Sequence, residues 1–202
     1  MEILTVVAIM SILSAVVVWS FGASRAAGLT AAGNTMVDVV SMARQNSISK
    51  NAYTAVVIKR HGDHALAAYC LVQLVRGDDG TFSTWQPLSA WRYLQPGIVF
   101  ETGQVGDTFI TDTPALPLPL PTQYSYKGQV IDLTEQSVWQ CFQPDGTLFG
   151  QQNPPVQLRL IEGVADTSDS SVAQGPTSGG AVANYYQLLF VSNTGVAMVQ
   201  RP

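Results

Sequence analysis

Formal charge is what this sequence has least of. Only 12% of its 202 residues are charged, the formal net charge is −4, and no run of Lys and Arg occurs anywhere. Proteins that bind nucleic acid without sequence preference hold the phosphate backbone with clustered basic side chains. The composition therefore argues against a general nucleic-acid surface.

Motifs of catalysis and of cofactor binding are also absent. The chain has no GxSxG, no P-loop and no HExxH. His61 and His64 lie on a predicted hairpin turn without a third ligand, which favours a solvated turn over a metal site. Asp78-Asp79-Gly80 offers oxygen ligands for Ca²⁺, but adjacent carboxylates in a glycine turn are usually only solvated. We expect no enzymatic activity, no metal and no cofactor.

Cysteine is scarce too. Cys70 and Cys141 are far apart in the sequence and form no CxxC or Cys/His zinc pattern. In an oxidising compartment they could form a disulfide; otherwise they are two small, buried apolar residues. The sequence leaves both alternatives open.

Long apolar runs are limited to one, at the start of the chain. The 21 residues from Ile3 to Ala23 carry no formal charge, and as a helix they would be about 31 Å long, close to the roughly 30 Å hydrocarbon core of a bilayer. Residues 1–23 are thus predicted to form the transmembrane half of a longer helix. A secretory signal peptide is disfavoured, because the first residues are acidic and the run is too long.

Glu2 directly precedes this run. An ionisable group at a membrane edge usually has a function and needs a partner. The alternative is a plain anchor whose Glu2 lies among lipid headgroups.

Residues 24–50 are predicted to continue the helix in amphipathic form. Polar residues recur at steps of three and four and give one face of the helix: Asn34, Asp38, Ser41, Gln45 and Ser49. The opposite face is an apolar stripe that a sheet of the same chain should cover: Leu29, Ala32, Met36, Val40 and Ala43. Gly22, Gly28 and Gly33 weaken the helix and suggest bending or close approach between subunits.

Residues 51–202 are predicted to form an antiparallel, β-rich globular domain, so the fold class is α+β. Ala52–Arg60 and Leu66–Val75 form a hairpin across Gly62-Asp63. Asp145-Gly146 and Asn193-Thr194-Gly195 are turn signals, because Gly and Asn accept positive φ. The other predicted strands are Phe82–Pro87, Ile98–Glu101, Val138–Phe142, Val156–Glu162, Tyr185–Ser192 and Val196–Gln200.

Two stretches interrupt the strands. Residues 114–121 alternate Pro with apolar residues and are predicted to run as an extended polyproline II connector, with a docking ligand for an aromatic groove as the alternative. Residues 166–181 are rich in Ser, Gly, Ala and Thr and are predicted to form a flexible loop.

A glutamate one step before a Leu/Val/Ile/Ala helix resembles the N-terminus of type IV pilins and of type II secretion pseudopilins. Met42-Ala-Arg44 near the helix end and Lys50-Asn51 before the first strand are similar to the H-type minor pseudopilins and FimT-like proteins, as are Phe142-Gln-Pro-Asp-Gly146 and Thr194-Gly195. A weaker resemblance is to pilin-like proteins of the Verru/Chthon cassette.

The resemblance implies a pilin-like fold and a structural subunit that other pilin or pseudopilin subunits and an assembly motor contact through the N-terminal helix. Glu2 would then pair with the α-amino group of a neighbouring subunit. The helix would cross the cytoplasmic (inner) membrane once, with the domain outside the cytoplasm, in a periplasm if the cell has one.

The start of the chain departs from the family pattern. In the family the glutamate is the fifth mature residue, after a basic leader, a glycine and an aromatic residue. We therefore expect the true start to lie upstream of Met1, encoded in frame, with a prepilin peptidase as a further partner.

The rival hypothesis is a FimT-like tip subunit that binds DNA or another extracellular polymer. It needs a basic patch that bears aromatic residues. The candidates are Lys59-Arg60 and Arg92, with Lys127 as a further one, and the net acidity makes nucleic acid a disfavoured partner.

Overall fold

The computed structural model describes residues 2–102, 108–111, 113–133, 137–150, 155–165, 171–173, 177–178, 181–182, 184–191 and 193–201, with the side chains of 2–5, 8, 12–25, 108, 171–173, 177–178 and 181 excepted. One long helix packs on antiparallel sheets. The predicted α+β architecture is confirmed.

Helix α1 (Glu2–Lys50) is continuous over 49 residues. All five residues of the predicted apolar stripe are buried, between 0 and 3% exposed, and all five of the predicted polar face are exposed. The helix ends where Asn51 takes a positive φ of 48°. Asn accepts this left-handed conformation, so the Lys50-Asn51 pair is a stop signal with a physical cause. The stop turns the chain back toward the first strand.

Most strands lie where the sequence predicts them: β1 (Thr54–Lys59), β2 (Ala68–Arg76), β3 (Phe82–Pro87), β5 (Ile98–Phe100), β8 (Ser137–Phe142), β9 (Val156–Ala165), β13 (Tyr185–Val191) and β14 (Val196–Gln200). The short elements were not predicted: α2 (Thr108–Thr111), β4 (Arg92–Tyr93), β6 (Gln123–Tyr126), β7 (Gln129–Asp132), β10 (Ser171–Ala173), β11 (Thr177–Ser178) and β12 (Ala181–Val182).

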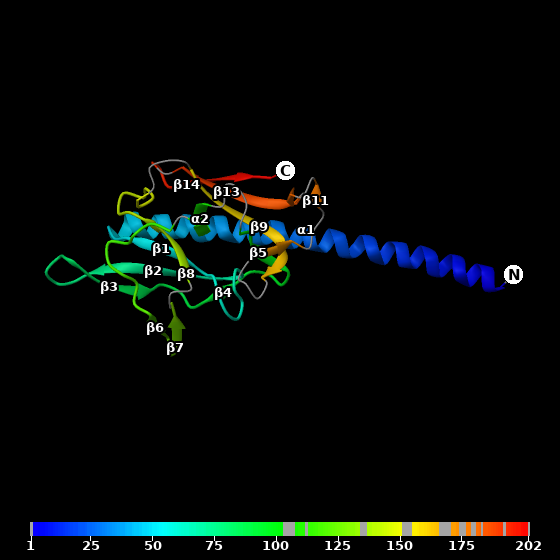
Figure 1. Cartoon of the computed structure of the whole chain (residues 1–202), viewed down its shortest axis with the longest axis horizontal. Helices are drawn as coiled ribbons and strands as arrows, with labels where there is room; N and C mark the ends of the chain where they lie inside the picture. The colour runs from blue at the N-terminus through cyan, green and yellow to red at the C-terminus, as the bar shows by residue number, and fades with distance from the viewer. Residues whose placement is uncertain are drawn as a thin grey trace.

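Two five-stranded sheets carry the fold (Figure 1). The first sheet has the order β3-β2-β1-β8, with β4 also paired to β2. The second sheet has the order β10-β9-β13-β14, with β5 also paired to β9. The predicted β1–β2 hairpin is confirmed, with Thr54 opposite Gln73 and Ile58 opposite Tyr69.

Two apolar cores follow from this arrangement. The helix core joins the α1 stripe to residues of both sheets, including Val56 and Leu71 of the first and Leu160 and Leu188 of the second. The outer core lies on the other face of the first sheet, since side chains alternate between faces along each strand. Its central residues include Val57, Cys70, Leu74, Trp85 and Cys141.

Residues 113–133 cover the outer core. Trp85 Nε1 donates to Leu118 O at 2.9 Å, and Trp139 Nε1 donates to Pro114 O at 3.0 Å. Tyr124 of the β6–β7 hairpin is buried in the same core. We call residues 114–121 the proline strap; it connects α2 to β6, and it also shields this chain's own aromatic surface.

Short strands fall within the predicted loop at residues 166–181. It contains β10, which extends the edge of β9 with Val172 opposite Val164, and β11, which pairs with β12. Pairing with β9 satisfies backbone N–H and C=O groups of β10. The composition of this stretch did not predict the partner. The rest of the predicted loop lies outside the described residues.

Candidate assembly surface of the N-terminal helix

The N-terminal half of α1 carries apolar side chains that its own domain does not cover. Figure 1 shows this half extending away from the sheets; we call Glu2–Arg25 the arm. Val6, Val7, Ile9 and Met10 are between 53 and 65% exposed. Contiguous exposed apolar surface of this kind indicates an interaction with protein or lipid.

Among the residues that the structure describes, no helix has the length and apolarity needed to cross a membrane. Much of the predicted transmembrane half consists of residues 12–25, whose side chains lie outside the described ones. The Glu2 side chain lies outside them as well. The role of Glu2 stays a prediction.

Close packing fixes the second half of α1 to the second sheet at Gly33 and Asn34. A Cβ on Gly33 would overlap the ring of Tyr186, and Tyr186 Oη donates to Asn34 Oδ1 at 2.9 Å. The Arg201 guanidinium lies 4.6 Å from the centroid of the same ring. Gly33 therefore allows close approach of helix and strand within one chain. Sequence reasoning noted this glycine but did not predict its partner, because only the fold brings residue 186 to it.

Arg44 fastens the far end of the helix to two turns. Its Nε lies 2.8 Å from Thr194 O and 3.3 Å from Gly146 O, so one N–H is shared between two carbonyls. Gly146 and Gly195 have φ of 84° and 63°, which confirms both predicted turns. A Cβ on Gly195 would overlap Gly146 O, so the two turns touch. Three sequence motifs named above thus meet at one point.

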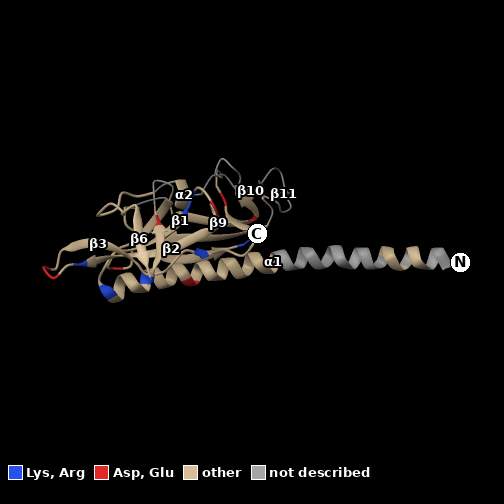
Figure 2. Ribbon diagram, turned by 90° about the horizontal axis from the view of Figure 1, so that it is seen from below, with Lys and Arg blue, Asp and Glu red and all other residues tan. Residues whose placement is uncertain are grey.

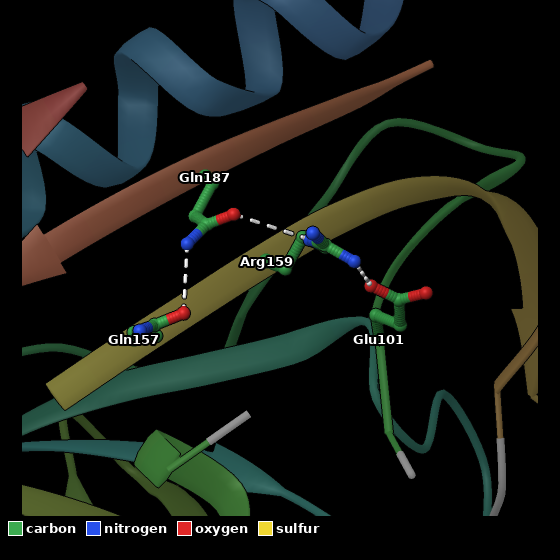
Figure 3. Close-up of polar contacts among 4 residues, drawn as sticks. All are labelled: Glu101, Gln157, Arg159 and Gln187. Atoms are coloured by element: carbon green, nitrogen blue, oxygen red, sulfur yellow. Dashed lines mark hydrogen bonds and ion pairs between the residues drawn. The ribbon is translucent and has the colours of Figure 1, made fainter. Parts of the chain in front are cut away.

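A polar network ties the second sheet together (Figure 3). Arg159 Nη1 lies 3.0 Å from Glu101 Oε2, Arg159 Nε donates to Gln187 Oε1 at 3.3 Å, and Gln187 Nε2 donates to Gln157 Oε1 at 2.8 Å. Glu101 is 3% exposed, and a buried carboxylate needs such a paired cation. The Arg159 guanidinium also stacks on Tyr185 at 4.0 Å. These contacts pair the charge of Arg159 within the sheet, where the side chain helps to hold β9 and β13 together.

The structure has Cys70 and Cys141 as free, buried thiols. They lie on β2 and β8, on opposite sides of β1, facing Val57 and Ala55 respectively. Two strand spacings amount to about 9.6 Å, more than the roughly 7 Å between Cα atoms that a disulfide can bridge. Burial raises the pKa of the Cys70 thiol to about 12 and raises that of Cys141 as well. In this fold the two residues are buried parts of the outer core.

The other residues considered from the sequence lie apart. His64 packs against Tyr93 with ring centroids 4.7 Å apart, and Asp79 accepts hydrogen bonds from Thr81 N and Oγ1, which lower its pKa. Within the described part of the chain, no three His, Cys, Asp or Glu residues gather as metal ligands would.

Basic candidates for polymer binding separate into two places. Lys59 is the last residue of β1 and Arg60 follows it, and Arg92 lies opposite Tyr69 of the neighbouring β2. Lys127 is instead on the β6–β7 turn. The patch expected for a tip subunit is therefore divided.

No protein-family model matches the chain, and no curated protein sequence matches it. Its structural neighbours are a type IV minor pilin and a minor pseudopilin. The crystal structure of the type IV minor pilin FimU of Pseudomonas aeruginosa is 12% identical, with a TM-score of 0.40 over 86% of this chain and 87% of that one. The minor pseudopilin EpsH of the Vibrio cholerae type 2 secretion system is 12% identical, with a TM-score of 0.42 over 86% of this chain and 95% of that one.

Proposed function

We propose that this chain is a minor, pseudopilin-like structural subunit of a type II secretion or type IV pilus-type filament, assembled through its N-terminal helix. One observation carries the proposal. Helix α1 is continuous, and its second half is built into the core of the domain while its first half presents uncovered apolar side chains. An arm of this kind needs an apolar environment outside its own chain.

The arm can satisfy this need in two successive environments. In a bilayer, lipid covers the apolar residues of the run from Ile3 to Ala23. In a filament, arms of neighbouring subunits cover one another, and the burial of apolar surface favours the bundle once water replaces lipid. The subunit would span the cytoplasmic membrane once, with its domain outside the cytoplasm, and an assembly motor would extract it.

Glu2 gives the proposal its sharpest test. A carboxylate that enters an apolar bundle is tolerable when it is paired, since an uncompensated buried charge costs roughly 3–5 kcal/mol. The pairing group in this proposal is the α-amino group of the adjacent subunit, which would hold the helices in register. The role is mechanical and not catalytic.

The experiment compares Glu2→Ala and Glu2→Gln in the full-length, processed protein in membranes. Both variants should insert as well as the parent or better, because a bilayer prefers the neutral residue. Both should cross-link poorly to their partner subunits. Asp38→Asn is the matched control, because it removes a carboxylate from the exposed face of the packed half of the same helix.

Unimpaired cross-linking in both Glu2 variants would show that Glu2 is a headgroup-level residue of a plain anchor. A defect in Glu2→Ala alone would point to packing and not to charge, because Gln keeps the shape of Glu.

A further inference from the structure

A groove of about 730 Å³ lies at the end of the domain from which the arm emerges. Its walls are the loop after β1, the loop between β4 and β5, and the end of β9, with His64, Tyr93, Gln95, Ile98 and Val164 among the lining residues. Its volume falls within the range of ligand-binding clefts. No residue of the polar network or of the Arg44 contact lines it.

The position of the groove along the helix axis can be derived from one contact. A Cβ on Gly28 would lie 3.0 Å from Gln95 Oε1, so the groove is level with Gly28. Gly28 follows the apolar run by five residues, a rise of about 7.5 Å. The headgroup region of a bilayer extends roughly 5–8 Å beyond the hydrocarbon core on each side. If the apolar run spans the core, the groove lies among the headgroups.

Basic side chains outnumber exposed carboxylates among the described residues around this end. Arg60 and Arg92 are exposed, and Lys59 Nζ donates to Asp63 O at 2.8 Å. Asp63 is the exposed carboxylate among the described groove residues, and the nearby Glu162 is buried and accepts a bond from Asn184. Asp78 and Asp79 lie in the turn between β2 and β3, at the end of the molecule opposite the arm (Figure 2). Basic residues also lie toward that opposite end, with Arg76 at the end of β2 and Lys50 at the end of α1.

Tyr93 and His64 supply aromatic rings to the groove, and the backbone at His64 and next to the groove at Leu66 has positive φ. Tyr93 is 56% exposed, and amphipathic rings of this type favour the membrane interface. His64 and Leu66 both have positive φ, 59° and 54°. Leu66 is held there because its N donates to Lys59 O at 2.8 Å and its O accepts from Phe100 N at 2.7 Å. Such strain persists where the surroundings over-determine it, often at functional sites.

We propose that this groove and its basic rim, Lys59, Arg60 and Arg92, are a docking face for the headgroups of anionic phospholipids. The inference rests on the membrane anchoring in the proposed function. Docking fixes the orientation of the domain on the bilayer before assembly. When the arm is extracted from the bilayer, the groove separates from the lipid headgroups.

The test uses the full-length protein in vesicles, with anchoring measured separately by flotation. Backbone hydrogen exchange of residues 59–67 and 92–98 is compared between vesicles of phosphatidylcholine alone and vesicles that also contain phosphatidylglycerol. Exchange should be slower with phosphatidylglycerol, unchanged in the β2–β3 turn, and equal between the two lipids at high salt, because salt screens the surface potential.

The variant Arg60→Gln with Arg92→Gln should lose this protection, since each basic residue near an anionic surface changes binding roughly fivefold. The matched control is Lys50→Gln with Lys127→Gln, which removes the same charge from positions distant from the groove and should keep the protection. Exchange in β9 and β13 shows whether each variant is folded.

Three outcomes overturn the inference. Equal exchange in both lipids, with normal flotation, refutes headgroup docking and leaves the proposed function intact. Protection by an added DNA duplex in neutral vesicles, without protection by phosphatidylglycerol, assigns the groove to polymer binding. Failure of the parent chain to float refutes the anchoring itself.

Discussion

At the scale of single residues, Gly33 shows why a helix-weakening residue lies in the packed half of α1. Its missing Cβ leaves space for the Tyr186 ring, whose hydroxyl then reaches Asn34. Glycine lowers helix stability by up to about 1 kcal/mol relative to alanine. We expect the packing against Tyr186 to stabilise the protein by more than this loss of helix stability.

Gly33→Ala should therefore destabilise the protein, by about 1–3 kcal/mol, because the added methyl group overpacks the contact with Tyr186. Denaturant unfolding of the full-length chain measures the change. Gly28→Ala is the control on the same helix, because its Cβ would meet only the end of the flexible Gln95 side chain. Equal or increased stability of Gly33→Ala would contradict the packing role.

At the scale of elements, α1 is held to the domain by a stripe of buried side chains, by the Tyr186–Asn34 hydrogen bond and by the Arg44 contact at its far end. Val40 and Ala43 are buried in the helix core, and Arg44 bridges the turns that carry Gly146 and Thr194. The turns belong to different sheets, the first sheet through β8 and the second through β13 and β14. Arg44 thus connects α1 to the turn after β8 and to the turn between β13 and β14.

Arg44→Ala should lower the free energy of unfolding by roughly 1.5–3 kcal/mol, the range for a hydrogen bond made by a charged group. Arg44→Lys should recover only part of it, since an ammonium on a flexible stem does not reproduce the guanidinium geometry. Gln45→Ala, at the exposed neighbouring position, is the control for helix effects. If Arg44→Ala matched Gln45→Ala in denaturant unfolding, the bridge would contribute nothing.

Elements with a strong local signal were predictable, and those that depend on distant partners were not. The stripe from Leu29 to Ala43 follows helical periodicity, and Gly146 and Gly195 have the backbone freedom that their turns require. Strand β4 has two residues and exists because Ala68 and Tyr69 lie beside it. The partners of Gly33, Arg44 and the proline strap could not be derived either, because each is set by tertiary contacts. The groove joins residues from 62–67, 93–99 and 163–165. The sequence singles out His64 and the Gly62-Asp63 turn but does not predict that these segments meet.

At the scale of the whole molecule, both cores contain buried groups that titrate in alkaline solution. The outer core contains Cys70, Cys141 and the buried Tyr124 hydroxyl, and the helix core contains the Tyr69 hydroxyl. Burial, together with nearby Cys70, raises the pKa of Tyr124, and burial also raises the pKa of Tyr69. Desolvation keeps these groups protonated in the folded chain.

Stability should therefore fall in alkaline solution. The ordinary thiol pKa is 9.0, and burial raises that of Cys70 to about 12, with Cys141 shifted in the same direction. Between these values the unfolded chain releases protons that the folded chain retains, so the free energy of unfolding decreases by up to about 1.4 kcal/mol per pH unit for each thiol. Below pH 9 this stabilising contribution is fully present.

Urea unfolding of the full-length chain across the alkaline range measures this dependence. The double variant Cys70→Ala with Cys141→Ala should show a shallower slope just above pH 9, with the remainder from Tyr124 and Tyr69 at higher pH. An identical slope in the parent and the variant would mean that the thiols do not carry the effect.

The continuity of α1 has a mechanical consequence. A pull on the arm acts along the axis of the same rod that lies in the helix core, so the load is shared at once by the side chains from Leu29 to Ala43 and by the Arg44 contact. The pull loads these contacts together, in shear, and does not break them one after another. In the proposed extraction by an assembly motor, a pull on the arm would therefore move the domain as one body, because the load would reach it through the contacts of α1 and not through those between the strands.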